Sequence, residues 1–452
     1  MFDDTCATAA IAAEVDARIQ AEATHSIPPD RDTAAALTHE YVMSCLACNE
    51  LGDGTLFMNL HQGRFLYDAA AGQWYVWSGH FWTMDIEGRA LAAVEKVSLA
   101  YVNALTCISK KLSTTEDEAA AEALKAQRKL LIRRIDWLRK VKGRINCLIF
   151  ATTLPTEALP DGKNPLVITG EKLDQNPWLL ACQNGVIHLE TGSFRPGRPA
   201  DLLTKPAPHP FPENIGPYLA TGENTPAPTW ERFLWEVMDG DQEMVDYLQR
   251  LLGYCVTGST RDHIFIVFTG TGRNGKSTLL EILSKVVGEI AVAIKPEMLL
   301  DQRRVRSSAG ADADVMALKG RRVAIASEAD DNQGFSRATV KRLTGGDSIS
   351  ARSPHEKFQV TFRPTHKLIF STNDIPRANP NDRAFWLRMH LVNFPLSFVD
   401  NPAAPNERQV DKGLPARLEA EAGGILAWLV RGALLYKQRG LDPPKKVTEA
   451  TA

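Results

Sequence analysis

In its second half, the chain alternates between short apolar runs and longer segments with helical periodicity. Residues 263–269 are almost continuously apolar, which is typical of a strand buried on both faces of a parallel sheet. A helical pattern follows over residues 276–287, and further apolar strands are predicted over 323–326 and 367–372. Strands that alternate with helices predict a parallel sheet covered on both faces. The fold class expected here is α/β.

The first 205 residues show a different pattern. Residues 1–33 are rich in alanine, which predicts a flexible or helical tail. Aromatic alternation predicts a hairpin over 65–77, helices are expected over 87–150, and 178–198 has the pattern of a small β unit. We therefore expect a mixed α+β domain over residues 34–205.

A proline-rich stretch over residues 206–228 separates the two patterns. Such a composition favours an extended linker over a packed element, so we place a domain boundary there. The α/β domain is then expected over residues 229–398. A helical C-terminal segment is expected over residues 399–452.

Composition narrows the class of protein only modestly. The chain of 452 residues has a net charge of -2, which does not indicate a nucleic-acid binder, although a net charge hides local excesses. We find no run of 18 apolar residues and no signal peptide, so a cytoplasmic protein without a membrane span is expected. Cys45 and Cys48 form a CxxC, and without a second ligand pair a core helix is favoured over a metal site.

Residues 125–144 are strongly basic. They contain nine Lys or Arg side chains against one acid, Asp136. A solvated helix face is the favoured interpretation, and contact with nucleic acid is the alternative.

The predicted strand at 263–269 leads directly into a glycine-rich motif that fits G-x-x-x-x-G-K-[ST]. In this motif, backbone N–H groups and a helix N-terminus cradle phosphate oxygens. Lys276 would reach the β- and γ-phosphates of ATP, and the Ser277 hydroxyl would ligate Mg²⁺. A glycine-rich turn with an incidental lysine is the alternative. The residues expected to contact the nucleotide are Gly270, Thr271, Gly272, Arg273, Asn274, Gly275, Lys276, Ser277 and Thr278.

Polar side chains follow the next two predicted strands. Glu328 lies two residues after the strand at 323–326, where it would hold Mg²⁺ through water or polarise the attacking water. Asn373 follows the strand at 367–372 and would orient a water against the γ-phosphate. The alternatives are a surface glutamate and a turn asparagine. Asp330 and Asp331 lie close to Glu328, so which acid does which task stays open.

Four further segments resemble superfamily 3 helicases of the phage and plasmid primase-helicase type, which have poxviral relatives. They are residues 341–352, 370–376, 382–388 and 424–430. The resemblance implies an AAA+ P-loop NTPase core in a hexameric ring that hydrolyses ATP with Mg²⁺. It also implies 3′ to 5′ translocation on single-stranded or forked DNA, with the N-terminal domain serving as a collar or a DNA contact.

The same resemblance assigns roles to basic residues. Arg388 matches an arginine that acts on the neighbouring subunit's site, with Arg383 as a nearby competitor. Predicted strands at 349–353 and 357–362 match a hairpin in the pore, where Arg352, His355 and Lys357 would hold DNA phosphates. Residues 337–388 carry ten Lys or Arg against four acids, which suits a DNA channel, whereas a solvated surface hairpin is the alternative.

These features favour a DNA helicase in phage, plasmid or mobile-element replication, inside a bacterial or virus-infected cell. A ring-forming, ATP-dependent DNA-binding scaffold or loader is the alternative, and a metabolic P-loop kinase finds no support. Residues 1–170 lack a primase pattern, so a separate primase or a replication initiator is an expected partner. Relatives commonly continue beyond a stretch like residues 443–451, so either a truncated form of a longer chain or a shortened family member is expected.

Overall fold

The computed structural model describes residues 4–24, 37–155, 157, 159, 162–301, 313–327, 334–352, 359–375 and 381–450. The chain packs as two compact units. The first comprises residues 1–77 and 83–170, and the second comprises residues 78–82 and 171–452.

The first unit is a helical bundle with a small sheet. Its helices are α1 (Asp4–Thr24), α2 (His39–Ala47), α3 (Asn49–His61), α4 (Arg89–Thr114), α5 (Glu118–Leu138) and α6 (Val141–Thr152). The sheet has the order β3-β2-β1-β4, from β1 (Phe65–Asp68), β2 (Gln73–Trp77), β3 (Trp82–Met84) and β4 (Val167–Ile168). The predicted hairpin is present, with Phe65 opposite Val76. Helix α1 buries Ile11 and Val15 in the core, so much of the expected tail is a packed helix.

Helix α4 is long and apolar enough to cross a membrane by length and composition alone. Our expectation of no span rested on unbroken apolar runs, and Glu95 and Lys96 interrupt this one. In the structure, α4 buries Val94, Val97 and Tyr101 in the core of the first unit. The core helix of a globular unit passes the same composition test, so the finding is weak evidence for a span.

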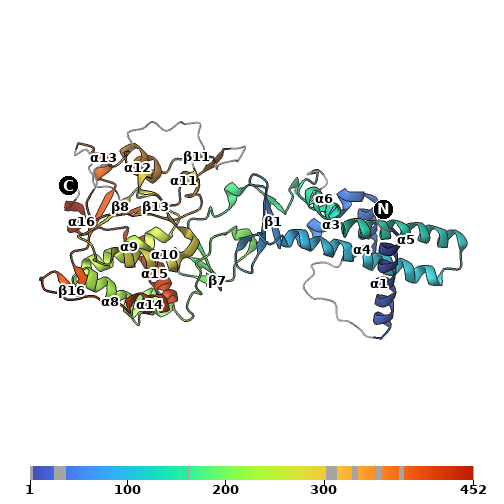
Figure 1. The fold of residues 1–452 in the computed structure, drawn as a ribbon, viewed down its shortest axis with the longest axis horizontal. Helices are drawn as coiled ribbons and strands as arrows, with labels where there is room; N and C mark the ends of the chain where they lie inside the picture. Colours follow the sequence, from blue (N-terminus) through green and yellow to red (C-terminus); the bar gives the residue numbers. More distant parts are fainter. Residues whose placement is uncertain are drawn as a thin grey trace. The chain divides into compact units, whose positions relative to one another are not determined.

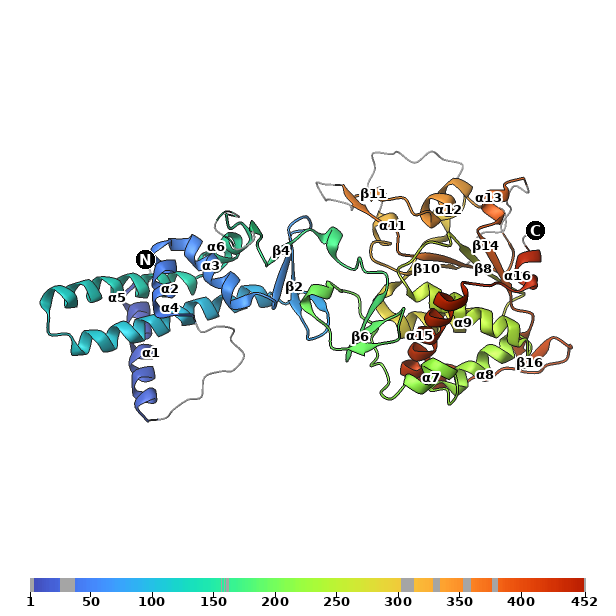
Figure 2. The ribbon, with the colours of Figure 1, turned by 180° about the vertical axis from the view of Figure 1, so that it is seen from behind.

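The second unit is built on a five-stranded parallel sheet with the order β14-β8-β13-β10-β9. Its strands are β8 (Phe265–Thr269), β9 (Ala291–Ala293), β10 (Val323–Ser327), β13 (Lys367–Ser371) and β14 (Met389–Asn393). Helices α9 (Gln242–Val256), α10 (Lys276–Val287) and α15 (Ala422–Arg439) lie on one face, whereas α11 (Ala313–Met316) and α12 (Arg337–Thr344) lie on the other (Figures 1 and 2). The side chains of β8 alternate between the two faces of this sheet. Ile266 and Phe268 pack in the hydrophobic core on one face, and Phe265 and Val267 pack in the core on the other. The fold is therefore mixed α/β with a parallel sheet, as expected for this half.

The proline-rich stretch is not an extended linker in the structure. Phe211 and Tyr218 are buried, α7 (Gly216–Thr221) forms within it, and Ala207 pairs with Cys182 of β5 (Leu179–Cys182). Its apolar side chains stand between the prolines and enter the core of the second unit. The boundary between the units therefore lies at residues 170 and 171 instead.

The expected C-terminal segment likewise belongs to the second unit, because α15 packs directly on α9. Two glycines permit this approach. A Cβ atom at Gly253 would lie 2.1 Å from the carbonyl carbon of Gly432, and one at Gly432 would lie 2.0 Å from the oxygen of Gln249. The backbones of the two helices are thus in direct contact.

Two buried cations fix the edge of the sheet where β10 and β13 begin. Arg322 donates to the oxygens of Val256 (2.8 Å) and Asn176 (3.2 Å), and Lys367 donates to the oxygen of Thr257 at the end of α9. Burial lowers the pKa of Lys367 to about 7 and that of Arg322 to about 10. The carbonyl end of a helix favours cations, so α9 holds both strands in place.

We predict that Gly253→Ala will lower the stability of the second unit by about 2 kcal/mol, because the new methyl group must separate α9 from α15. Urea unfolding should show a lower midpoint. The control is Gly216→Ala, where a Cβ atom meets nothing within 4 Å. Equal midpoints for both variants would contradict the close contact.

Candidate functional site

The glycine-rich motif forms a tight loop between β8 and α10. Gly270, Gly272 and Gly275 have φ angles of 147°, 96° and 88°, which favour glycine. A Cβ atom would lie 2.5 Å from the oxygen of Phe394 at Gly270 and 2.7 Å from Val237 Cγ1 at Gly275. The loop ends at the N-terminus of α10, where helical N–H groups favour anions. The expected loop geometry is therefore present.

Lys276 is the first residue of α10, directly after the loop, and is buried. Its ammonium group donates to the Gly270 oxygen (2.8 Å) and to Asn373 Oδ1 (3.2 Å), and burial lowers the pKa of Lys276. Thr269 Oγ1 donates to the Asn373 oxygen (3.2 Å), which fixes the asparagine backbone. The structure thus brings together two of the four residues predicted to be catalytic. Their catalytic roles stay predictions.

The loop also offers groups suited to a nucleotide phosphate and its metal. Asn274 is buried, and its Nδ2 atom finds no hydrogen-bond partner among the described residues. An unpaired buried donor is costly unless a ligand satisfies it, which fits a triphosphate in the loop. Ser277 is exposed at the start of α10, where a hydroxyl would be free to bind Mg²⁺.

Glu328 lies outside the described residues. The strand before it ends at Ser327, which pairs with Ser371 of β13 two residues before Asn373. Strand β10 therefore ends at the same edge of the sheet as Asn373. The role of Glu328 as a metal or water ligand stays a prediction.

A pocket of about 450 Å³ adjoins the loop. One wall is Arg273, Asn274 and Ser277, and the opposite wall comes from β15 (Ser397–Val399), β16 (Glu407–Gln409) and α14 (Leu414–Ala420). Ser397 Oγ donates to the Gly272 oxygen (3.1 Å), which attaches β15 to the loop. The apolar residues of the pocket suit a nucleotide base: Phe233, Phe398, Val399, Val410, Leu414 and Pro415. Sequence reasoning missed this wall because three-residue strands have no visible periodicity.

Arg388 lies at the opposite edge of the sheet. It precedes β14, whose first residue Met389 pairs with Phe265, whereas the phosphate-binding loop follows the other end of β8. The Arg388 Nη1 atom donates to the His263 oxygen (3.3 Å) and to Thr344 Oγ1 (3.4 Å). The structure therefore separates Arg388 from Lys276 within one subunit.

Arg383, the competing arginine, is the exposed first residue of α13 (Arg383–Trp386). Asp382 before it accepts from Lys341 (2.7 Å) and Arg337 (2.9 Å), and the Lys341 bond lowers the pKa of Asp382. Part of the basic excess over residues 337–388 is thus neutralised locally.

The predicted hairpin forms from β11 (Ile349–Ala351) and β12 (Val360–Phe362), with Ile349 opposite Phe362. Its core face is apolar and buried. Arg352 follows β11 and is exposed, as a DNA contact requires. His355 and Lys357 lie outside the described residues, so their contact with DNA stays a prediction.

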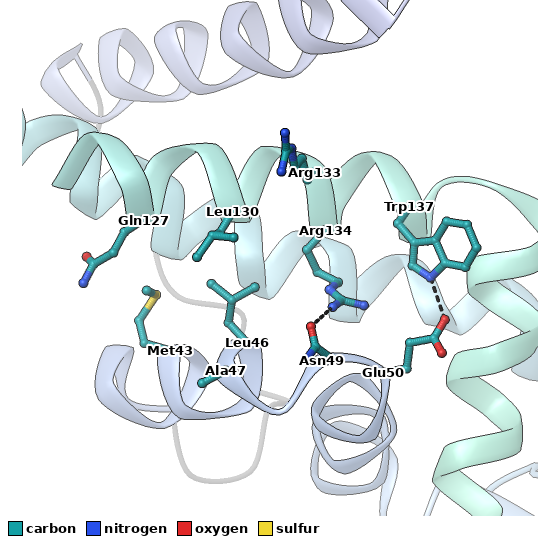
Figure 3. Close-up of a pocket in the computed structure, with 10 residues that line it drawn as sticks. All are labelled: Met43, Leu46, Ala47, Asn49, Glu50, Gln127, Leu130, Arg133, Arg134 and Trp137. Carbon is teal, nitrogen blue, oxygen red and sulfur yellow. Dashed lines mark hydrogen bonds between the residues drawn. The ribbon is translucent and has the colours of Figure 1, made fainter. Parts of the chain in front are cut away.

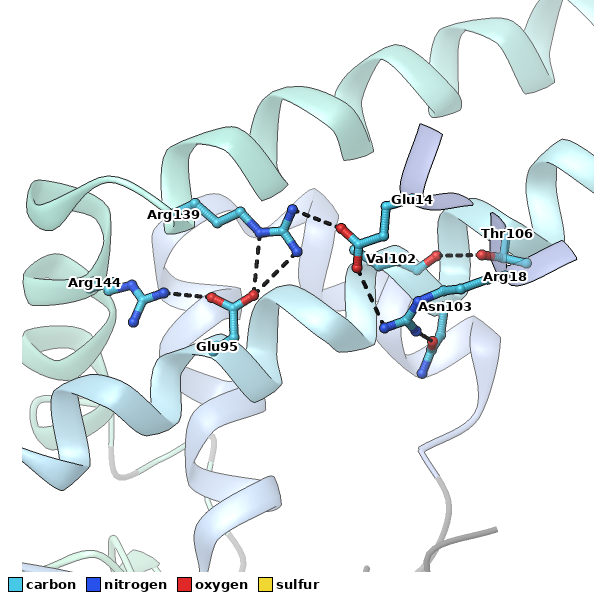
Figure 4. Close-up of polar contacts among 8 residues, drawn as sticks. All are labelled: Glu14, Arg18, Glu95, Val102, Asn103, Thr106, Arg139 and Arg144. Carbon is cyan, nitrogen blue, oxygen red and sulfur yellow. Dashed lines mark hydrogen bonds and ion pairs between the residues drawn. The ribbon is translucent and has the colours of Figure 1, made fainter. Parts of the chain in front are cut away.

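Several side chains of the basic stretch pair with acids of the first unit. Arg139 donates to Glu14 (2.9 Å) and Glu95 (3.2 Å), and Arg144 donates to Glu95 (2.5 Å) (Figure 4). Arg134 likewise forms an ion pair with Asp53 (3.1 Å). These contacts favour a structural role over a nucleic-acid contact.

The same unit contains a pocket of about 780 Å³ between α2 and α5. Figure 3 shows that Arg134 and Trp137, two of its lining residues, are bound to Asn49 and Glu50 of the opposite wall. Cys45 is buried in α2 and Cys48 is exposed at its end, which agrees with the predicted helix.

Two protein families match the chain. Residues 54–239 match the family described as D5 N terminal like, and residues 268–384 match a family of unknown function (DUF5906). The first match includes much of the first unit and the start of the second. The second match includes the phosphate-binding loop, Asn373 and the hairpin.

The relatives include proteins from several viruses. A protein of Acanthamoeba polyphaga mimivirus, named as a candidate helicase, is 26% identical over 86% of this chain and 40% of its own length. A similarly named protein of Invertebrate iridescent virus 6 is 30% identical over 62% of this chain and 31% of its own. A candidate primase of African swine fever virus is 23% identical over 52% and 24%, respectively. The chain thus spans less than half the length of these relatives.

We predict that Asn373→Asp will weaken the binding of a fluorescent ATP analogue roughly tenfold or more, because a carboxylate would pair with the Lys276 ammonium and repel phosphate. The control is Asn393→Asp, an exposed position at the same edge of the sheet, opposite Thr269. Equal affinities for the two variants would show that contact with Lys276 does not matter for binding.

Proposed function

We propose that the chain is an ATP-dependent DNA helicase of a primase-helicase family related to the poxviral one, which the family match and the viral relatives support. The observation that carries the proposal is the contact between Lys276 and Asn373 at the phosphate-binding loop. A loop without such a partner would suit many nucleotide-binding proteins. In the proposed motor, the Asn373 amide beside the lysine would orient the attacking water.

The sheet supports an AAA+ core of the superfamily 3 type. Counted in chain order, its strands lie in the order 5-1-4-3-2. The fourth strand therefore lies between the strand of the phosphate-binding loop and the third strand. Asn373 follows this fourth strand, which explains why it reaches Lys276.

In this proposal each residue has a defined task in ATP hydrolysis. Lys276 neutralises charge on the β- and γ-phosphates, and Asn373 orients the attacking water. Ser277 and Glu328 would hold Mg²⁺, which when bound neutralises charge on the phosphate oxygens. Arg388 of a neighbouring subunit would stabilise the charge that develops on the γ-phosphate, an effect worth roughly 10³ to 10⁵ in rate.

We further propose a homo-hexameric ring that moves 3′ to 5′ along single-stranded DNA. Arg352, His355 and Lys357 of the β11–β12 hairpin would hold the DNA phosphates. The candidate helicases and primases among its relatives support a task in viral or phage-type DNA replication, inside the host cell. A primase or replication initiator, either separate or on a longer form of the chain, would complete the machinery.

Strand displacement on forked DNA tests the proposal. A helicase should release the displaced strand with ATP and Mg²⁺, and only when a 3′ single-stranded arm is present. If single-stranded DNA stimulates ATP turnover but no strand is released, the scaffold or loader function replaces the helicase.

We predict that Lys276→Ala will abolish ATP turnover, because Lys276 is the buried cation of the loop and would neutralise the β- and γ-phosphates. Lys285→Ala is a suitable control, since this lysine lies on the same helix and pairs with Glu281 at the surface. Phosphate release measures turnover, and circular dichroism checks the fold. Normal turnover in the Lys276→Ala variant would sink the nucleotide assignment.

Arg388→Ala should also lose turnover, by roughly 10³-fold or more, with little change in ATP affinity. Mixing this variant with Lys276→Ala subunits should restore part of the activity. In such mixtures an intact loop meets an intact arginine from its neighbour. Absence of rescue at every mixing ratio would contradict an arginine that acts between subunits.

A further inference from the structure

His263 stands at a junction between three parts of the second unit. It lies two residues before β8 and has a φ angle of 52°, an uncommon conformation for a residue other than glycine. Its Nδ1 atom lies 2.9 Å from the oxygen of Thr344 and donates to it, because a carbonyl oxygen only accepts. Strained residues concentrate at functional sites, which makes this junction a candidate.

Thr344 connects the junction to the β11–β12 hairpin. It is the buried last residue of α12, and only residues 345–348 separate it from the strand that begins at Ile349. Its hydroxyl donates to the Val340 oxygen (2.8 Å), so its lone pairs remain available for a second donor. That donor is Arg388 Nη1, at 3.4 Å.

The contacts of Arg388 leave part of its guanidinium available. Nη1 meets both the His263 oxygen and the Thr344 hydroxyl, whereas Nε and Nη2 make no hydrogen bond with the described residues. The backbone is fixed as well, because the Phe265 amide donates to the Arg388 oxygen (2.6 Å). A guanidinium has five donors, so the two contacts at Nη1 orient it and leave Nε and Nη2 for a phosphate.

We propose that Thr344 and His263 are positioning residues for Arg388, and that they tie its orientation to the base of the β11–β12 hairpin. When DNA displaces the hairpin, the end of α12 would move with it and shift the Thr344 hydroxyl. The hydroxyl would then reorient Arg388, which acts on the nucleotide of the neighbouring subunit. The proposal rests on the proposed function, and it adds a route by which DNA controls ATP turnover.

Thr344→Val tests the proposal, because valine keeps the shape and removes the hydroxyl. With single-stranded DNA, the kcat for ATP should fall roughly tenfold while KM changes little, as expected for an interaction made only in the transition state. The stimulation of turnover by DNA should fall with it. Thr344→Ser keeps the hydroxyl and should restore both values to within about twofold of wild type.

Thr106→Val is the matched control. Thr106 is also buried in a helix, and its hydroxyl bonds the Val102 oxygen (3.0 Å) four residues earlier, as Thr344 does with Val340. It belongs to the first unit, whereas Arg388 belongs to the second. If Thr344→Val behaves like this control, or if Thr344→Ser is as impaired as Thr344→Val, the proposal is overturned.

Mixed assemblies separate positioning from general damage. Thr344→Val subunits mixed with Lys276→Ala subunits should regain turnover, because the Lys276→Ala neighbour supplies a well-oriented Arg388. Lack of rescue, when Arg388→Ala is rescued in the same way, would overturn the proposal. Normal ATP turnover by Arg388→Ala would overturn the proposed role of Arg388, and this inference with it. The outcomes given above for the Thr344 variants overturn this inference alone, so the two failures are distinguishable.

His263→Gly is a second variant, which tests the proposal even when Thr344→Val fails to fold. Glycine accepts the φ angle of 52° without strain and keeps the carbonyl that faces Arg388, but it removes the ring that holds the end of α12. DNA stimulation of turnover should fall, because a displacement of the hairpin would no longer be held to Arg388 by the ring. Full DNA stimulation in this variant would contradict the route through the junction.

Discussion

The arrangement of the second unit depends on the direct pairing of β13 with β8. This pairing puts the Asn373 amide 3.2 Å from the Lys276 ammonium, and it leaves β10 to end at the same edge. At the opposite edge, the same order puts two buried cations, Arg322 and Lys367, against the carbonyl end of α9. One edge of the sheet therefore collects groups for a phosphate, and the other is fixed by charge and helix dipole.

Local patterns predicted the elements of this unit well. The apolar run before Gly270 and the helical pattern after it are β8 and α10, and the strands that end near Ser327 and Ser371 are present. The contact between Lys276 and Asn373 joins residues 97 positions apart, and it depends on strand order. Strand order is a non-local property, so the sequence pointed to each residue separately but not to the contact between them.

Composition was a poor guide to the structure where contacts between residues far apart in the sequence determine how a segment packs. The prolines of residues 206–228 predicted a linker, but Phe211 and Tyr218 among them are buried. The count of charges over 125–144 likewise ignored Glu14 and Glu95, which pair with Arg139. The wall of the pocket next to the phosphate-binding loop escaped notice because β15 and β16 have three residues each.

The separation of Lys276 and Arg388 on opposite edges of one sheet has a consequence for symmetry. If Arg388 of one copy completes the phosphate-binding loop of another, the surface that carries the arginine differs from the surface that carries the loop. When these two surfaces lie on different faces of the chain, the contact is heterologous, and repeated copies form a closed ring or an open arc. An open arc would leave one terminal copy with a loop but no incoming arginine, and the other with an arginine but no loop to serve. Turnover per chain should therefore rise when the arc closes.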